Sequence, residues 1–268
     1  MKIGFVSDEI SSNIEIAINK CIEWNIDTLE LRNLLTGRLP YVDKEEKEKL
    51  FKLVKNFNIN ISAISPGIFR YEYQDTEKLK LDFEKTLPDT IQLCERLNCK
   101  KIIIFGFRRK NLLDDTDLDN VINEFGKVAE IAAKYDINIA IENGYDSWCK
   151  ESKRILRIFE ILNCKNLGIN WDPANAIADN EKPFPDTYEK IKSFITNLHV
   201  KDTKHNGNFI CLPIGEGNVD WEGQIKAILT DIPDINITIE THCEPLIINS
   251  KKNLEKLKEI INNILTKK

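Results

Sequence analysis

Hydrophobic positions along the chain alternate between two spacings. Short runs rich in β-branched residues, some of them almost continuously apolar like Lys101–Phe105, are typical of strands buried on both faces. Longer Lys/Glu-rich stretches lie between them, and their apolar residues recur every three or four positions, as on the buried face of a helix. The pattern predicts eight strands, each followed by a helix: Lys2–Ser7, Thr28–Arg32, Ile59–Ile64, Lys101–Phe105, Ile137–Glu142, Leu167–Trp171, Ile195–Lys201 and Ile235–Glu240.

Strict alternation of strand and helix favours parallel strands joined by crossover helices. Eight such units in 268 residues match a single (β/α)8 TIM barrel, which typically takes roughly 250 residues. The turn after the first expected strand, Ser7–Asn13, contains no glycine, so the glycine-rich fingerprint of a dinucleotide-binding sheet is absent. No linker or composition break divides the chain, and we therefore expect one domain over residues 1–268.

Composition and charge limit the cellular compartments and the classes of partner that the sequence predicts. Hydrophobic residues make up 42% and charged residues 30%, and no apolar run approaches the ~18 residues that a membrane span needs. The first residues lack the apolar core of a signal peptide, and the seven cysteines form no CxxC pair, so they are expected to be reduced thiols in the cytoplasm. A net charge of −5 without a basic cluster disfavours nucleic acid and membrane surfaces as partners.

Candidate chemistry gathers at the ends of the last four expected strands. Catalytic residues of TIM barrels stand at the C-terminal ends of the strands, and Glu142, Asp172, His199 and Glu240 occupy four consecutive ends. Adjacent strands lie about 5 Å apart, so these groups are expected to meet at the barrel mouth. A single acidic residue there, such as Asp172 before Pro173, is more often a turn or capping residue. Four in series indicate a site for one divalent ion (Mn²⁺, Mg²⁺, Co²⁺ or Zn²⁺), and the absence of cysteine there argues against structural zinc.

Five motifs resemble the sugar isomerase/epimerase superfamily, whose fold is the xylose isomerase-like TIM barrel. They are Ile-Glu-Asn-Gly, Trp-Asp-Pro-Ala-Asn, Leu-His-Val-Lys-Asp, Pro-Ile-Gly-Glu-Gly-Asn-Val-Asp-Trp and Ile-Glu-Thr-His, all within residues 139–243. This superfamily includes ketose 3-epimerases, sugar-phosphate epimerases, inosose dehydratases and hydroxypyruvate isomerases. By this resemblance Glu142, Asp172, His199 and Glu240 match the metal ligands. Glu142 and Glu240 also match the catalytic pair that removes and returns a proton beside the substrate carbonyl.

The resemblance also implies substrate contacts, with two departures. Asn175 stands where ketose epimerases place a substrate-binding histidine, and His205 stands where they place a substrate-contacting arginine. Lys201 belongs to the His-x-Lys-Asp variant of the sugar-phosphate and inositol-pathway branches. Separately, Arg108 and its neighbour Arg109 follow the fourth expected strand. An arginine pair at the mouth is able to clamp a phosphate or carboxylate, and a solvated pair of loop charges is the alternative.

Other strand-end residues have two interpretations each. Polar ones are either site residues or ordinary loop partners, and aromatic ones either border the site or pack in the core. These residues are Glu30, Arg32, Ser65 and His242, and the aromatic Phe5, Phe69, Phe107 and Trp171.

The sequence therefore favours a metal-dependent isomerase or epimerase that acts on a sugar, sugar phosphate or polyol-derived ketone. An inosose-type dehydratase begins with the same proton removal and stays open. An apurinic endonuclease uses the same barrel but binds three zinc ions with more histidines than His199, His205 and His242 supply. A binding module without catalysis is the remaining alternative. The exact substrate, its phosphorylation, the metal and a homo-oligomeric state are not determined by the sequence.

Overall fold

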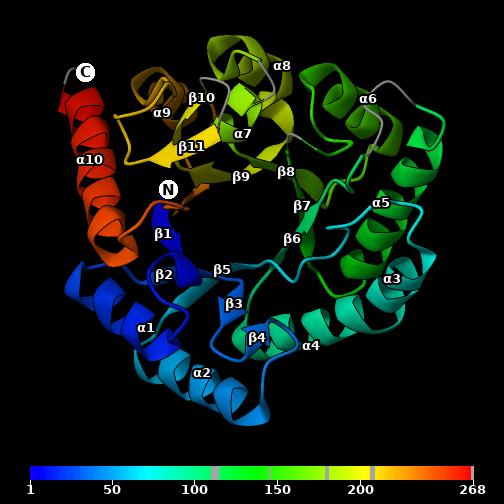
Figure 1. Ribbon diagram of the computed structural model, residues 1–268, viewed down its shortest axis with the longest axis horizontal. Coiled ribbons are helices and arrows are strands. Elements are labelled where there is room, and N and C mark those ends of the chain that lie inside the picture. The colour runs from blue at the N-terminus through cyan, green and yellow to red at the C-terminus, as the bar shows by residue number, and fades with distance from the viewer. Residues whose placement is uncertain (110–114, 145, 179–180, 206–208, 267–268) are drawn as a thin grey trace.

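A closed parallel barrel of eight strands forms the centre of the molecule, in the order β1-β12-β9-β8-β7-β6-β5-β2. The computed structural model describes residues 1–109, 115–144, 146–178, 181–205 and 209–266. Helices form an outer ring around the barrel, which Figure 1 shows nearly end-on. The predicted TIM barrel fold is confirmed.

Each barrel strand lies within one of the eight ranges that the hydrophobic pattern predicts, and some strands start one residue later than predicted. They are β1 (Lys2–Val6), β2 (Thr28–Leu31), β5 (Asn60–Ile64), β6 (Lys101–Phe105), β7 (Asn138–Glu142), β8 (Leu167–Trp171), β9 (Ile195–Val200) and β12 (Asn236–Ile239). Lys201 and Glu240 therefore lie one residue beyond the last paired residue of their strands, where the backbone leaves the sheet and the side chains reach the mouth.

The surrounding helices bury the apolar stripe that their sequences predict. The α-helices are α1 (Ile14–Glu23), α2 (Lys44–Asn56), α3 (Thr76–Leu81), α4 (Leu87–Leu97), α5 (Leu118–Ala133), α6 (Ser152–Leu162), α7 (Pro173–Ala178), α8 (Tyr188–Ile191), α9 (Trp221–Asp231) and α10 (Leu246–Thr266). In α10, Leu254, Leu257 and Ile261 face the core. Within the described residues, no helix combines the length and apolar character needed to cross a membrane.

Two packed regions explain why the strands are apolar on both faces. Ala63, Ile103 and Ala140 form a small cluster of their own, and their neighbours along the strands pack against the helices in the main core. Trp171 is fully buried and donates its indole N–H to Gln224 Oε1 at 3.0 Å, so it is a core residue and not a sugar platform. Phe5 is also a core residue and packs against Trp24, with ring centroids 5.5 Å apart.

Two small hairpins follow barrel strands and were not predicted from the sequence. The strands β3 (Asn33–Leu34) and β4 (Gly37–Arg38) come after β2, and β10 (Asp202–His205) and β11 (Phe209–Leu212) come after β9. Each of the first two strands has only two residues, which is too short to produce an alternating pattern. Both hairpins leave the C-terminal ends of their barrel strands and contribute side chains to the mouth.

Candidate functional site

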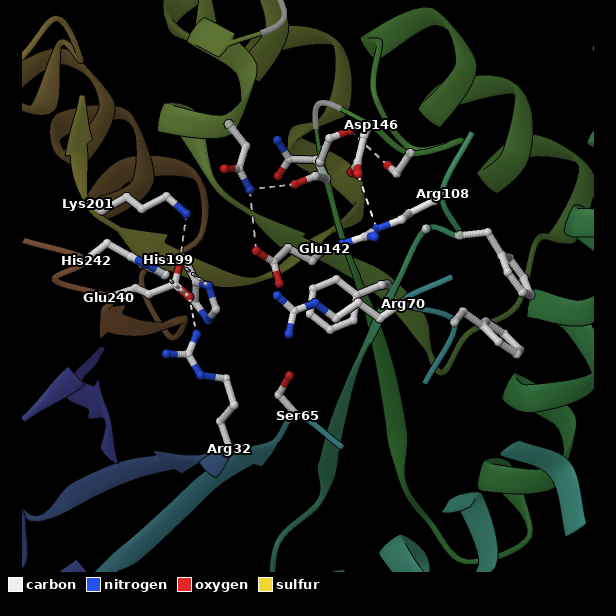
Figure 2. Close-up of a pocket in the computed structure, with 18 of the residues that line it drawn as sticks. Arg32, Ser65, Arg70, Arg108, Glu142, Asp146, His199, Lys201, Glu240 and His242 are labelled. Carbon is white, nitrogen blue, oxygen red and sulfur yellow. Dashed lines mark hydrogen bonds and ion pairs between the residues drawn. The ribbon is translucent and has the colours of Figure 1, made fainter. Parts of the chain in front are cut away.

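A cavity of about 380 Å³ opens at the C-terminal mouth of the barrel. Residues that follow β2, β5, β6, β7, β9 and β12 line it, including both hairpins. Figure 2 shows charged side chains pointing into this space from several sides. Its size and position suit a small molecule.

The four predicted metal ligands meet at one side of this cavity. One ligand atom from each of Glu142, Asp172, His199 and Glu240 lies within 4.8 Å of the corresponding atoms of the other three. Asp172, His199 and Glu240 are buried, whereas Glu142 is half-buried at the end of β7. A group of three carboxylates and one imidazole is therefore preassembled by four adjacent strands.

Asp172 caps a helix with one carboxylate oxygen, while its second oxygen lies on the site side near Lys201. Its Oδ1 accepts hydrogen bonds from the backbone N–H groups of Ala174 (2.9 Å) and Asn175 (3.2 Å) at the start of α7. The side chain of Asn143 fixes the Asp172 backbone, donating to its carbonyl at 2.9 Å and accepting from its N–H at 2.7 Å. The turn-and-cap role and the ligand role thus use different oxygens of one carboxylate.

His199 is oriented by a carboxylate from the far side of the barrel. Its Nε2 lies 3.0 Å from both carboxylate oxygens of Glu30, which comes from β2. Its Nδ1 is buried, makes no hydrogen bond within the described part of the chain and lies 3.5 Å from Glu240 Oε2. A proton on Nε2 that is donated to Glu30 leaves the Nδ1 lone pair for a metal, the usual carboxylate–histidine–metal arrangement. The donor set therefore fits a divalent ion.

Lys201 brings a positive charge into the carboxylate group. Its Nζ lies 2.6 Å from Asp172 Oδ2 and 2.9 Å from Glu240 Oε2, and the side chain is buried while still bordering the cavity. Burial by itself lowers the pKa of Lys201, but these carboxylates outweigh it and raise that pKa well above its usual value. The predicted substrate-binding residue thus also neutralises two of the candidate ligands.

Glu240 is held by cations from several elements. Arg32 Nη1 lies 2.7 Å and His242 Nε2 lies 3.0 Å from Glu240 Oε1. Arg32 is itself paired with Asp8 and Glu9, so its guanidinium is fixed by three carboxylates. His242 also approaches Glu9 at 3.4 Å, and its side chain is 40% exposed at the rim.

The two predicted catalytic glutamates have opposite electrostatic environments. Burial raises the pKa of Glu142, and the nearby negative charge of Glu240 raises it further. Burial also favours the neutral form of Glu240, but the positive charges of Lys201, His242 and His199 prevail and hold its pKa well below the usual range. Paired carboxyl groups whose environments separate their protonation states are typical of acid–base sites.

The other predicted substrate-binding residues, Asn175, Arg108 and His205, differ in where they lie relative to the cavity. Asn175 borders the cavity, and its Nδ2 donates to the Asn143 carbonyl at 2.8 Å and lies 3.4 Å from Glu142 Oε1. Arg108 lines the cavity and pairs with Asp146 at 3.3 Å. His205 ends β10, and its side chain lies outside the described residues.

Arg109 does not form a clamp with Arg108, so the predicted arginine pair is wrong in that half. Its guanidinium lies over the Trp148 ring at 4.7 Å and pairs with Asp115 at 2.7 Å, and the residue is buried. Arg108 has about half of its side chain exposed, whereas the side chain of Arg109 is buried. Only Arg108 of the two borders the cavity within the described part of the chain.

Sequence reasoning missed two further arginines, Arg38 and Arg70. Both line the cavity, Arg38 from the β3–β4 hairpin and Arg70 from the loop after β5. They stand six residues after Arg32 and five after Ser65, too far from the strand ends for strand position alone to select them. Phe69 and Phe107 form the buried floor beside them, stacked with ring centroids 4.0 Å apart.

Asp202, the last residue of the Leu-His-Val-Lys-Asp motif, has a structural role. Its carboxylate accepts backbone N–H bonds from Thr203 (2.8 Å), Gly215 (2.8 Å), Gly217 (3.1 Å) and Val219 (3.1 Å). The Pro-Ile-Gly-Glu-Gly-Asn-Val motif is therefore wound around this buried carboxylate. These two sequence motifs are one structural unit beside the site.

The candidate metal-ligand groups differ from those of a multi-zinc nuclease centre. Among the residues that the structure describes, two groups are arranged to hold an ion: the quartet above, and Glu9 with Glu240 and His242. Each of these groups contains a single histidine, whereas the three-zinc alternative requires several.

Two curated relatives show similarity in sequence. The protein MJ1311 of Methanocaldococcus jannaschii is 25% identical over 284 residues, which cover 100% of this chain and 93% of the relative. The probable L-ribulose-5-phosphate 3-epimerase UlaE of Mycoplasma pneumoniae is 30% identical over 127 residues, covering 47% of this chain and 41% of the relative.

Solved structures show the same fold at low sequence identity. A D-tagatose 3-epimerase-like protein superposes with a TM-score of 0.80 at 23% identity, covering 99% of this chain and 100% of that one. The IOLI protein with a bound zinc atom superposes with a TM-score of 0.79 at 16% identity, covering 100% and 99%. The family model described as xylose isomerase-like TIM barrel matches residues 18–264. With this match, the closed parallel barrel and the site at its mouth, the chain belongs to the xylose isomerase-like TIM barrel family.

Proposed function

We propose that the protein is a divalent-metal-dependent isomerase or epimerase of a sugar, a sugar phosphate or a sugar-derived ketone. The observation that carries this proposal is the convergence of Glu142, Asp172, His199 and Glu240 within 4.8 Å at the barrel mouth. The similarity to a probable L-ribulose-5-phosphate 3-epimerase and to a D-tagatose 3-epimerase-like structure supports the same class of reaction.

The same four residues are the proposed holders of the ion. Their carboxylate oxygens and the buried Nδ1 of His199 suit Mn²⁺, Mg²⁺, Co²⁺ or Zn²⁺, and the zinc of the IOLI structure supports a metal in this fold. When bound, such an ion supplies Lewis-acid polarisation of a carbonyl, which makes the neighbouring C–H more acidic.

Glu142 and Glu240 are the proposed proton-transfer pair. Both side chains reach the cavity, from β7 and from the residue after β12, so each has access to a substrate in that space. One removes the proton beside the carbonyl and the other returns a proton, and the roles exchange in the reverse reaction. Arg32 and His242 fix the orientation of Glu240, and Asn175 lies beside Glu142.

The substrate is proposed to be a small carbohydrate, with its polar groups oriented by the rim of the cavity. Lys201 and Asn175 stand next to the quartet, and Arg108 lies on the side opposite Glu240. The buried Phe69 and Phe107 rings give part of this space an apolar lining that limits contact with water. Limited water favours proton return to the same substrate molecule over loss to solvent.

Hydrogen–deuterium exchange tests the proposal directly. The protein with Mn²⁺ is incubated in D₂O with a panel of ketoses, sugar phosphates and inososes, and carbon-bound deuterium is measured by NMR. We expect exchange at the carbon beside the carbonyl for one class of substrate. This readout registers enolisation whether the product is an epimer, an isomer or a dehydrated ketone. Absence of exchange across the panel with a metal-loaded, folded protein contradicts the proposal.

A further inference from the structure

The cavity has a second charged wall, formed by Arg38 and Arg70. They reach it from the β3–β4 hairpin and the loop after β5, on the opposite side from the residues that follow β9 and β12. In Figure 2, Arg70 extends beneath Glu142 with Ser65 beside it, whereas Lys201, His199 and Glu240 gather on the other side. Arg38 and Arg70 therefore line a different side of the cavity from Lys201, His199 and Glu240.

Within the residues that the structure describes, these two arginines form no ion pair with a carboxylate, unlike other cations around the cavity. Arg32, Lys201 and Arg108 are each paired with carboxylates. Arg38 instead donates to the Ser65 carbonyl and hydroxyl oxygens, both at 3.0 Å. Arg70 makes no ion pair within 4 Å in the described part of the chain. Among the described residues, no carboxylate therefore lies within 4 Å of either guanidinium group, and both line the cavity.

Both guanidinium groups use the same aromatic ring as a support. The Phe105 ring centroid lies 5.6 Å from the guanidinium carbon of Arg38 and 5.3 Å from that of Arg70. Burial, followed by the charges of Arg32 and Arg70, lowers the pKa of Arg38 to about 10, although Asp8 and Glu142 act in the opposite direction. Two like charges near the same ring, each acting on the other, favour the binding of an anion near them.

The backbone around the cavity-lining arginines adopts several conformations that most residues disfavour. Gly67 has φ +91°, a backbone conformation that favours glycine, and a Cβ there would lie 3.0 Å from Arg38 Nε. Phe69 (φ 62°) and Phe107 (φ 48°) are left-handed although bulky residues rarely adopt this region. Each directly precedes a cavity-lining arginine, Arg70 or Arg108, while its own ring is buried.

We infer that Arg38 and Arg70 bind a phosphate group, so that the substrate of the proposed reaction is a phosphorylated sugar. A phosphate monoester carries about −1.5 to −2 at pH 7 and three acceptor oxygens, which matches two uncompensated guanidinium forks. A carboxylate, with one charge, leaves one guanidinium unneutralised. The inference rests on the proposed function, in which the sugar end of the substrate lies beside the carboxylate quartet. The phosphate end then contacts the two arginines.

Binding of inorganic phosphate tests the arginine wall without requiring any turnover. Metal-free protein is titrated with phosphate and, separately, with acetate by isothermal calorimetry, for the native chain and for Arg70→Gln, Arg38→Gln and the control Arg157→Gln. Arg157 lies on α6 and pairs at 3.8 Å with Asp119. We expect each cavity variant to weaken phosphate binding by about 10- to 100-fold, the control to match the native chain, and acetate to bind more weakly than phosphate.

The design separates loss of binding from loss of folding. Arg38 is tied to Ser65, so its replacement also perturbs a loop. The Arg70 side chain makes no hydrogen bond within the described part of the chain, and Arg70→Gln is expected to keep the native melting temperature. Phosphate binding that is unchanged in a folded Arg70→Gln variant overturns the inference. Acetate binding as tight as phosphate does the same, because it assigns the wall to a carboxylate.

A second measurement links the wall to the substrate. In the deuterium-exchange assay, the ratio of kcat/KM for a ketose phosphate to kcat/KM for the free ketose is expected to exceed one and to fall at least 10-fold in Arg70→Gln. Exchange without a preference for the phosphate ester refutes this inference and leaves the proposed function intact. Conversely, phosphate binding at the arginines with no exchange on any compound refutes the proposed function alone.

Discussion

Individual side chains at the barrel mouth carry more than one task each. Asp172 caps α7 with one oxygen and faces Lys201 with the other. One ring nitrogen of His199 contacts Glu30, and the second lies on the side of the quartet. Such doubly used residues are rigid, because each task fixes the rotamer that the other task needs. The residue scale is therefore where substitutions are expected to separate catalysis, metal binding and stability.

The two glutamates are expected to be required for turnover but not for binding. Glu142→Gln and Glu240→Gln keep side-chain size and one coordinating oxygen but remove the group that moves the proton. We expect each variant to lose at least ~10²-fold in turnover, a typical general acid–base contribution. Deuterium exchange under saturating substrate measures this loss, with Glu222→Gln on α9 as a control remote from the cavity. Near-native rates in both variants would show that proton transfer uses other groups.

Glu30 is expected to act on the metal only through His199. Glu30→Gln keeps the shape but weakens the contact that fixes the imidazole, since a neutral amide accepts a hydrogen bond less strongly than a carboxylate. We predict that affinity for Mn²⁺ falls by about 10- to 100-fold, the usual cost of losing a partner of a metal-binding histidine. Equilibrium titration with Mn²⁺ measures the affinity. An unchanged affinity would mean that the contact of His199 Nε2 with the two Glu30 oxygens, each at 3.0 Å, has no influence on metal binding by His199.

At the scale of elements, the loops after the strands decide the shape of the site. The β3–β4 hairpin carries Arg38, the loop after β5 carries Arg70, and the β10–β11 hairpin contributes Phe209 and Cys211 to the cavity wall. The strands and the residues directly after them supply the quartet, whereas the loops supply the charges that we propose to select the substrate. This division is typical of TIM barrels, whose loops vary over a constant scaffold.

Asp202 is expected to stabilise one such loop. Asp202→Ala removes the acceptor of four backbone N–H groups, from Thr203, Gly215, Gly217 and Val219. Buried donors without a partner are costly, and we expect the free energy of unfolding to fall by about 2–4 kcal/mol. Urea denaturation measures the change, and Asp119→Ala, whose side chain is 87% exposed, is the control with an expected effect of about 0.5 kcal/mol or less. A similarly small effect for Asp202→Ala would contradict the structural role of the motif.

At the scale of the whole molecule, the quartet joins the second half of the barrel into one unit. Its members come from β7, β9 and the residues after β8 and β12, so an ion bound there connects segments up to 98 residues apart. Any ligand that binds only the folded chain stabilises it by mass action. Metal binding and global stability are therefore expected to be coupled.

Addition of Mn²⁺ to metal-free protein is predicted to raise its melting temperature. At a free concentration 100 times the dissociation constant the stabilisation is about 2.7 kcal/mol, which corresponds to several degrees for a chain of this size. Calorimetry on the native chain, Asp172→Ala and His199→Ala measures this shift, and elemental analysis of the purified proteins measures the bound metal. We expect both variants to lose most of the ion and the shift. Native occupancy in both would remove the quartet as the metal site.

The sequence by itself determined the barrel and the position of the quartet. Strand and helix periodicities are local properties, and the rule that strand ends share one face converts Glu142, Asp172, His199 and Glu240 from separate positions into neighbours. Trp171 had two open interpretations, because periodicity shows that a residue is apolar but not what surrounds it. Its burial against Gln224 became visible only in the fold.

Only the tertiary structure decided the contacts that cross the barrel or depend on loop geometry. Glu30 and His199 are 169 residues apart in sequence and come from strands that are not paired with each other, so no strand-to-strand rule joins them. Arg38 and Arg70 reach the cavity through a two-residue hairpin strand and a left-handed turn at Phe69, whereas Arg109 turns away from the neighbouring Arg108. The physical reason is that periodic elements fix side-chain direction by residue spacing, while in loops each backbone dihedral angle depends on packing against distant parts of the chain.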